Sequence, residues 1–95
     1  MGSKTDYGWH LLSNHGKVLI CVARDPEVRV SEIAEKVGIK ERAVQRILRE
    51  LRDEGLVSAT RDGRRNRYRI NRRRAVPELA DRSVPVGQLL DALDA

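Results

Sequence analysis

The run from Gly38 to Tyr68 joins an amphipathic helix to a hairpin rich in arginine, and few folds accommodate that pair. At about 100° per residue, the helix predicted over residues 40–54 has one apolar arc and one basic arc. The apolar arc consists of Ala43, Val44, Ile47, Leu48 and Leu51, and the opposite arc consists of Arg42, Gln45, Arg46, Arg49 and Arg52. The first arc predicts a core-facing surface. Taken alone, the second arc also fits an ordinary solvated helix.

A shorter helix is predicted directly upstream, over residues 30–37. We expect Ser31 to cap its first turn, because a serine hydroxyl can accept a backbone N–H there. Gly38 suits the left-handed conformation that commonly ends a helix. A short helix, a glycine turn and a longer helix together indicate a helix-turn-helix, whose second helix enters the major groove of DNA by its N-terminal residues.

A β-hairpin is predicted after the long helix, with strands over residues 56–61 and 66–70 and a turn over residues 62–65. The side chains alternate along each strand. Arg67 and Arg69 are expected to point outward, and the inward-pointing side chains are those of Val57, Ala59, Tyr68 and Ile70. Such a hairpin is a wing. The alternative is a solvated hairpin, but a surface that serves solubility alone would mix both signs of charge.

The basic side chains are concentrated in one part of the chain. Residues 40–74 carry thirteen basic and five acidic side chains, a net charge of +8, whereas the remaining residues carry six basic and nine acidic ones, a net charge of −3. A basic stripe of this kind indicates a polyanionic partner. Arginine also suits the role, because its fork donates two parallel hydrogen bonds to a guanine edge or a phosphate.

Residues 17–70 resemble the winged helix-turn-helix of small prokaryotic transcriptional regulators near the ArsR and MarR groupings, with GIKERAVQRILRELRDEGL and GRRNRY as the matching motifs. The resemblance implies an α+β fold, mainly α, with a three-helix core, a β-hairpin wing and an extra terminal helix. One departure is Lys40, where many such proteins have Ser or Thr, so a helix cap is lost. The paired thiolates of the metal-sensing ArsR branch are absent, because Cys21 is the sole cysteine.

These observations predict a sequence-specific regulator of transcription that binds double-stranded DNA. Helix 40–54 would read the major groove, and the wing over residues 61–69 would grip the backbone or the minor groove. The expected contacts are Ser31, Lys40, Arg42, Gln45, Arg46, Arg49, Arg64, Arg65, Asn66, Arg67 and Arg69. Two alternatives remain open: a non-specific architectural protein that binds DNA or RNA, and a winged helix that binds another protein.

The first helix is predicted to begin at a cap on Asn14 and to end at Asp25-Pro26, since proline forbids its continuation. Val28 and Val30 are then expected to add a short third strand to the wing. Cys21 lies on the first helix and is interpreted as a small buried apolar residue rather than a redox switch.

No catalytic or metal-binding pattern emerges from the sequence. His10 and His15 are five residues apart and do not share a helix face, which disfavours a metal site with Asp6 or Asp25. The chain has no phosphate-cradling glycine loop and no arrangement that favours a Ser-His-Asp triad. We therefore expect a non-enzyme without a cofactor.

The ends of the chain suggest a role in dimerisation. We divide the chain into an N-terminal segment (1–12), the DNA-binding domain (13–71), and a basic connector with a C-terminal helix (72–95). The helix, predicted over residues 83–93, either packs on its own domain or joins a homodimer, with contacts from Trp9, Leu11, Leu12, Val86, Leu89, Leu90 and Leu93. A small-molecule effector is not evident from the sequence.

Length and hydropathy limit the remaining possibilities. The 95 residues suffice for one domain with a modest core. No apolar run approaches the roughly 20 residues of a membrane span, so we expect no membrane partner and a cytoplasmic, nucleoid-associated protein.

Overall fold

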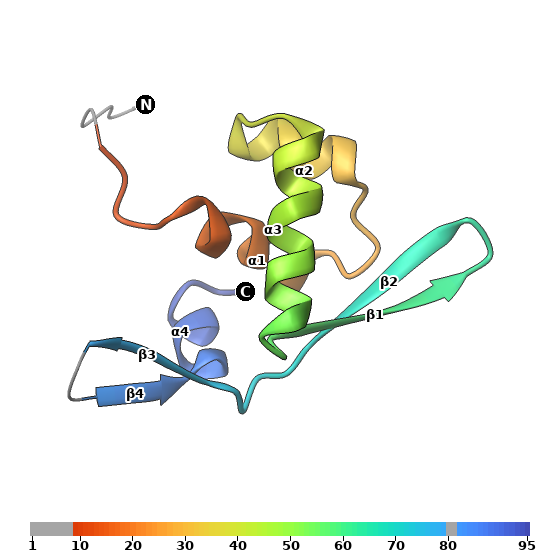
Figure 1. Ribbon diagram of the computed structural model, residues 1–95. Coiled ribbons are helices and arrows are strands. Elements are labelled where there is room, and N and C mark those ends of the chain that lie inside the picture. The colour runs from red at the N-terminus through yellow and green to blue at the C-terminus, as the bar shows by residue number, and fades with distance from the viewer. Residues whose placement is uncertain (1–8, 80–81) are drawn as a thin grey trace.

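The computed structural model describes residues 9–79 and 82–95. Three helices are followed by a hairpin, a second smaller hairpin and a short terminal helix (Figure 1). The elements are α1 (Asn14–Arg24), α2 (Val30–Val37), α3 (Glu41–Asp53), β1 (Val57–Asp62), β2 (Arg65–Ile70), β3 (Ala75–Leu79), β4 (Arg82–Pro85) and α4 (Val86–Ala92). This order confirms the predicted mainly helical α+β fold with a winged helix-turn-helix. Within the described ranges, no helix is both long enough and apolar enough to cross a membrane.

The core lies between α1, α2 and α3, with the base of the wing closing one side. Each helix turns its apolar stripe inward, as the helical spacing predicts. The least exposed side chains of the three helices are Val18, Val22, Ile33, Val44 and Ile47, each at most 1% exposed. The basic arc of α3 therefore faces away from the core.

The starts of α1 and α2 differ from the sequence predictions. Ser13, rather than Asn14, caps α1, and its Oγ accepts the backbone N–H of Gly16 at 3.2 Å. Helix α2 already begins at Val30, so Ser31 is its second residue and cannot cap it. The carboxylate of Glu32 instead accepts the backbone N–H of the cap residue, Arg29, at 2.9 Å.

The turn between α2 and α3 agrees with the prediction. Gly38 has φ +83° and ψ +34°, the left-handed conformation that other residues adopt at a cost, and its N–H donates to the carbonyl of Ala34 at 2.8 Å. Lys40 is the cap residue of α3, and its side chain makes no capping hydrogen bond. The loss of a cap at this position is confirmed.

The wing is the β1–β2 hairpin, and its two strands reach further than predicted. Asp62 pairs with Arg65, which leaves Gly63 and Arg64 as the turn. The predicted inward residues pair across the strands, Val57 with Ile70 and Ala59 with Tyr68, and are buried or half-buried. The alternation therefore correctly predicted which side chains of the hairpin face the core.

The predicted third strand of the wing is wrong. Its sheet contains β1 and β2 alone among the described residues. Val28 is 3% exposed and packs in the core, and Val30 is the first residue of α2. The connection between α1 and α2, residues 25–29, nevertheless touches the wing: the N–H of Tyr68 donates to the carbonyl of Pro26 at 2.8 Å.

The C-terminal region contains a hairpin that the sequence did not reveal. Strands β3 and β4 pair antiparallel, and α4 begins at Val86 rather than at residue 83. Helix α4 packs on its own domain, because Val86 and Leu90 are each 1% exposed within the common core. Of the residues expected at a dimer interface, Trp9, Leu11 and Leu89 remain as exposed large apolar side chains.

Arginines of the connector hold α4 in place. The carbonyl of Arg72 accepts the N–H of Gly87 at 2.8 Å, and the guanidinium donates to the carbonyl of Gly87 at 3.2 Å and to Asp91 at 2.5 Å. Arg74 donates to the carbonyl of Glu54 at 2.8 Å, at the end of α3. These two arginines, which the charge count placed in the basic stripe, have structural partners.

Candidate nucleic-acid interface

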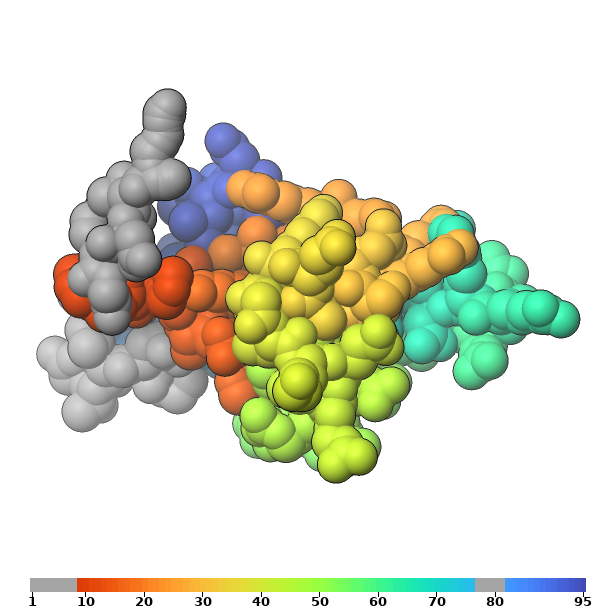
Figure 2. Space-filling model, turned by 90° about the horizontal axis from the view of Figure 1, so that it is seen from above, coloured from red at the N-terminus to blue at the C-terminus, as the bar shows by residue number. Residues whose placement is uncertain are grey.

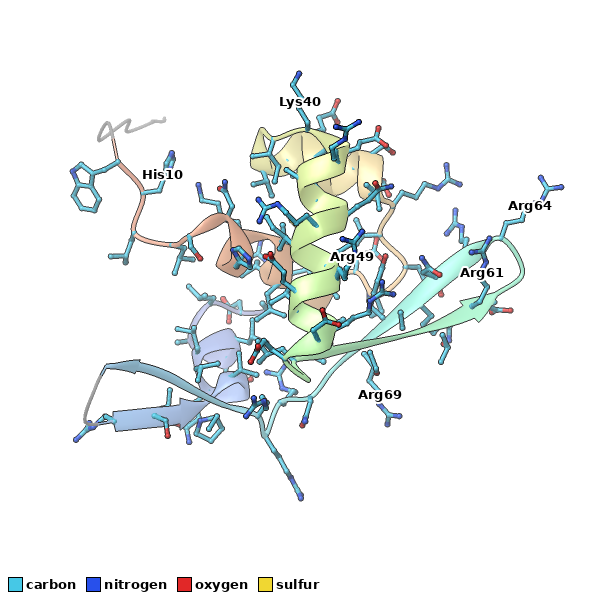
Figure 3. All side chains as sticks on the ribbon, viewed as in Figure 1. His10, Lys40, Arg49, Arg61, Arg64 and Arg69 are labelled. Atoms are coloured by element: carbon cyan, nitrogen blue, oxygen red, sulfur yellow. The ribbon has the colours of Figure 1, made fainter. Side chains whose placement is uncertain are left out.

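The basic face of α3 consists of Lys40, Arg42, Gln45, Arg46 and Arg49, and all five side chains are exposed. Helical spacing places them opposite the buried stripe of the same helix. Lys40 projects from the start of α3 and Arg49 lies nearer its end (Figure 3). No carboxylate that the structure describes lies within ion-pair distance of Lys40, Arg42 or Arg49, so their charges are available to a partner.

Arg46 differs from its neighbours, because it is part of a chain of three side chains. Its Nη1 lies 3.3 Å from Oε1 of Glu50, one turn later on α3, and Glu50 also accepts a hydrogen bond from Nε2 of His15 at 2.6 Å. The hydrogen bond from His15, with the positive charge of Arg46, holds the pKa of Glu50 below its usual value of 4.5. This contact could not be predicted from the sequence, since His15 and Glu50 are 35 positions apart in the chain.

The tip of the wing presents exposed polar and basic groups. Arg64 and Asn66 are exposed, and Arg64 points away from the body of the protein (Figure 3). The Nε of Arg61 donates to the carbonyl of Gly63 at 3.3 Å, which links this side chain to the turn. Seen from above, the wing extends from one end of the molecule (Figure 2).

Two further wing arginines share one carboxylate. Nη2 of Arg67 lies 2.6 Å from Oε2 of Glu27, and Nη1 of Arg65 lies 3.5 Å from Oε1 of the same residue. Glu27 belongs to the connection between α1 and α2, and no motif in the sequence points to it. No spacing rule could have found it, because its partners lie about forty positions further along the chain.

Ser31 and Arg69 occupy the margins of this surface. Ser31 is exposed in the first turn of α2, where the N-terminal end of the helix favours an anion. Arg69 is exposed on β2 but points to the side of the hairpin away from α3 (Figure 3). Arg69 therefore points away from the basic face of α3.

The described residues contain no cluster of metal-binding side chains. Among them, no group of three His, Cys, Asp or Glu side chains could hold a metal ion. Cys21 is half-buried and packs against the core. Asp6, one of the acids weighed for a metal site, lies outside the described residues.

The fold and this surface define a DNA-binding module, and comparison with known sequences assigns its family. The sequence model of the winged helix-turn-helix DNA-binding family matches residues 11–58, about half of the chain. The chain belongs to this family. No curated protein sequence matches it.

Solved structures share the fold. A protein from E. coli described as a predicted DNA-binding transcriptional regulator is 25% identical, with a TM-score of 0.57 over 81% of this chain and 70% of that one. A zinc-responsive MarR family member from Lactococcus lactis is 22% identical, with a TM-score of 0.53 over 73% of this chain. The match covers 49% of that protein, so this chain corresponds to about half of it.

Proposed function

We propose that this protein is a sequence-specific regulator of transcription that binds double-stranded DNA, with α3 in the major groove and the wing on the backbone or in the minor groove. The observation that carries the proposal is the basic face of α3. Lys40, Arg42 and Arg49 are exposed on it and have no described carboxylate within ion-pair distance. A helix of this kind fits the major groove, where side chains read base edges.

The roles of the side chains follow from their chemistry. Arg42, Arg46 and Arg49 can donate two hydrogen bonds each to a guanine edge, and Gln45 can pair with adenine. The wing residues Arg64 and Asn66 suit phosphate oxygens, which fix position without reading sequence. Ser31 at the start of α2 suits a phosphate as well, and Lys40 suits either a base or a phosphate.

Two features support DNA over the alternative partners. A winged helix that binds protein has no need of a basic recognition helix, whereas here the helix presents three cations without a described acidic partner. A non-specific architectural protein or an RNA-binding protein would use the same charges, so these two remain the competing functions. The E. coli neighbour, described as a transcriptional regulator, favours control of a promoter.

Selection from randomised duplexes tests the proposal. We expect the protein to enrich one short motif, and the motif's length and symmetry report the site and the oligomeric state together. A structured RNA and a random duplex, measured under one salt condition, serve as competitors. Failure to enrich any motif, or equal affinity for the RNA, would contradict sequence-specific DNA binding.

We further propose that the protein acts as a homodimer and is associated with the nucleoid. Trp9, Leu11 and Leu89 are large apolar side chains between 41% and 88% exposed, and large exposed apolar surfaces commonly mark interfaces. Two-fold symmetry would double the readout of an inverted repeat.

A further inference from the structure

Glu27 is an acid placed against a surface that is otherwise arranged for an anionic partner. Its two carboxylate oxygens contact different wing arginines, Oε2 with Arg67 at 2.6 Å and Oε1 with Arg65 at 3.5 Å. The carboxylate thus occupies both guanidinium groups at once. A duplex phosphate could make the same kind of contact, since it is also a small anion with several acceptor oxygens.

The backbone around Glu27 is fixed on both sides. Its N–H donates to Oδ1 of Asp25 at 3.1 Å, and the carbonyl of Pro26 accepts the N–H of Tyr68 on β2 at 2.8 Å. On the other side, the side chain of Val28 is 3% exposed in the core. Because the connection is tied to β2 itself, the Glu27 carboxylate stays beside the wing.

The contacts of Glu27 are open to a competing anion. The side chains of Arg65 and Arg67 are 51% and 57% exposed, and that of Glu27 is 42% exposed. Glu27 lines two hollows. One, of about 520 Å³, is lined by Glu27 with Arg67 and Arg69, and the other, of about 360 Å³, by Glu27 with Arg29, Arg64 and Arg65. A phosphate can reach either guanidinium without displacing a buried group.

We propose that Glu27 is an internal counterion of the wing, which duplex DNA must displace from Arg65 and Arg67 when it binds. The inference rests on the proposed DNA-binding function. In the free protein, Glu27 neutralises part of the charge that the two arginines would otherwise offer to any polyanion. In the complex, phosphate oxygens replace the carboxylate oxygens on the same guanidinium groups. Glu27 therefore lowers the affinity of the wing for DNA.

Glu27→Gln tests this inference, because it removes the competing charge and keeps the size of the side chain. Exposed ion pairs are weak, so we expect affinity for a duplex to rise roughly two- to tenfold. The direction is diagnostic, since loss of a residue that supports DNA binding would weaken it. The melting temperature of the variant should stay close to that of the parent protein.

Glu35→Gln is the matched control. Glu35 is exposed on α2, has no ion pair among the described residues, and its substitution changes the net charge by the same amount. A general electrostatic effect would act through both positions alike. We expect Glu35→Gln to change affinity less than about twofold, which is the size of a screened long-range effect.

A double-mutant cycle tests whether the gain in affinity depends on Arg65 and Arg67. In a protein that carries Arg65→Ala and Arg67→Ala, the further change Glu27→Gln should no longer tighten DNA binding. The two guanidinium groups for which Glu27 and phosphate compete are then absent. A gain that persists in that background would overturn the proposal. So would an unchanged or weakened affinity for Glu27→Gln alone, or a gain equal to that of Glu35→Gln. A parent protein that binds no duplex would overturn the proposed function together with this inference.

Discussion

Nε2 of His15 lies 2.6 Å from Oε1 of Glu50, so that a side chain of α1 contacts the exposed side of α3. Glu50 in turn accepts a hydrogen bond from Arg46, which belongs to the basic face of α3. The contact joins the first helix to one of the proposed base-reading residues through a single carboxylate.

The contact predicts a dependence of stability on acid pH. The hydrogen bond from His15 is the main cause that holds the pKa of Glu50 below 4.5. A carboxyl whose pKa is lower in the folded protein stabilises the fold above its unfolded pKa, and the contribution is lost as pH falls through the folded pKa. In His15→Ala, the pKa of Glu50 should rise towards 4.5, and stability below that pH should fall less steeply.

Titration of the Glu50 carboxyl by NMR, with thermal unfolding over the same pH range, measures both effects. His10→Ala is the control, because His10 is exposed in the N-terminal segment. An unchanged pKa of Glu50 in His15→Ala would show that this hydrogen bond does not control the titration.

Gly87→Ala should destabilise the C-terminal region. A Cβ on Gly87 would lie 2.8 Å from Cβ of Arg72 and 2.9 Å from its carbonyl oxygen, so the connector or α4 must shift. Overpacking of this kind costs about 1 to 3 kcal/mol. Gly16→Ala is the matched control, since its nearest contact would be 3.6 Å and alanine favours the helix by about 0.5 to 1 kcal/mol. Equal unfolding free energies of the two variants would argue against the close packing of α4.

Substitutions on α3 and on the wing should affect DNA binding differently. Arg49→Ala should cost about 1 to 3 kcal/mol on the preferred duplex and relax its sequence preference, because Arg49 lies on the basic face of α3. Arg64→Ala should weaken binding to all duplexes alike and reduce the slope of affinity against salt by about one, because we propose that Arg64 contacts phosphates. If the two variants lose affinity identically on selected and random duplexes, the assignment of helix and wing roles is wrong.

Dimerisation can be tested at the exposed apolar residues. Leu11→Asp with Leu89→Asp should give a folded monomer by sedimentation, with weaker binding to an inverted repeat whose half-site centres lie about 10 to 10.5 base pairs apart. Contact with a single half-site should persist. Leu90→Asp is unsuitable, because Leu90 is 1% exposed and a buried charge would unfold the protein. A parent protein that stays monomeric at micromolar concentrations would contradict the proposed homodimer.

The central fold could be predicted because its elements carry strong local signals. The stripe of α3 repeats at the helical period, Gly38 takes the left-handed turn, and Tyr68 alternates into the core. The residues at which the helices begin were harder to predict. Several neighbouring residues can serve as caps, and Ser13 competes with Asn14 at α1 much as Arg29 competes with Ser31 at α2.

The C-terminal hairpin and the ionic contacts could not be predicted, because tertiary packing determines them. Strands β3 and β4 lack a clear alternation, and Val86 and Leu90 gain a place in the core only once the connector folds back. The pairs of Glu27 with Arg67 and of His15 with Glu50 join residues 40 and 35 positions apart. Charge counting therefore identified the basic surface but not the acids that partly neutralise it.

The most direct test of sequence-specific binding compares the selected duplex with a scrambled duplex of the same composition across a salt series. We predict that the selected duplex binds at least about 10³ times more tightly. Between about 50 and 200 mM salt, affinity should fall roughly 10³- to 10⁵-fold if about 6 to 10 phosphates are neutralised. Equal affinity for the two duplexes, or an affinity that does not change with salt, would contradict the account.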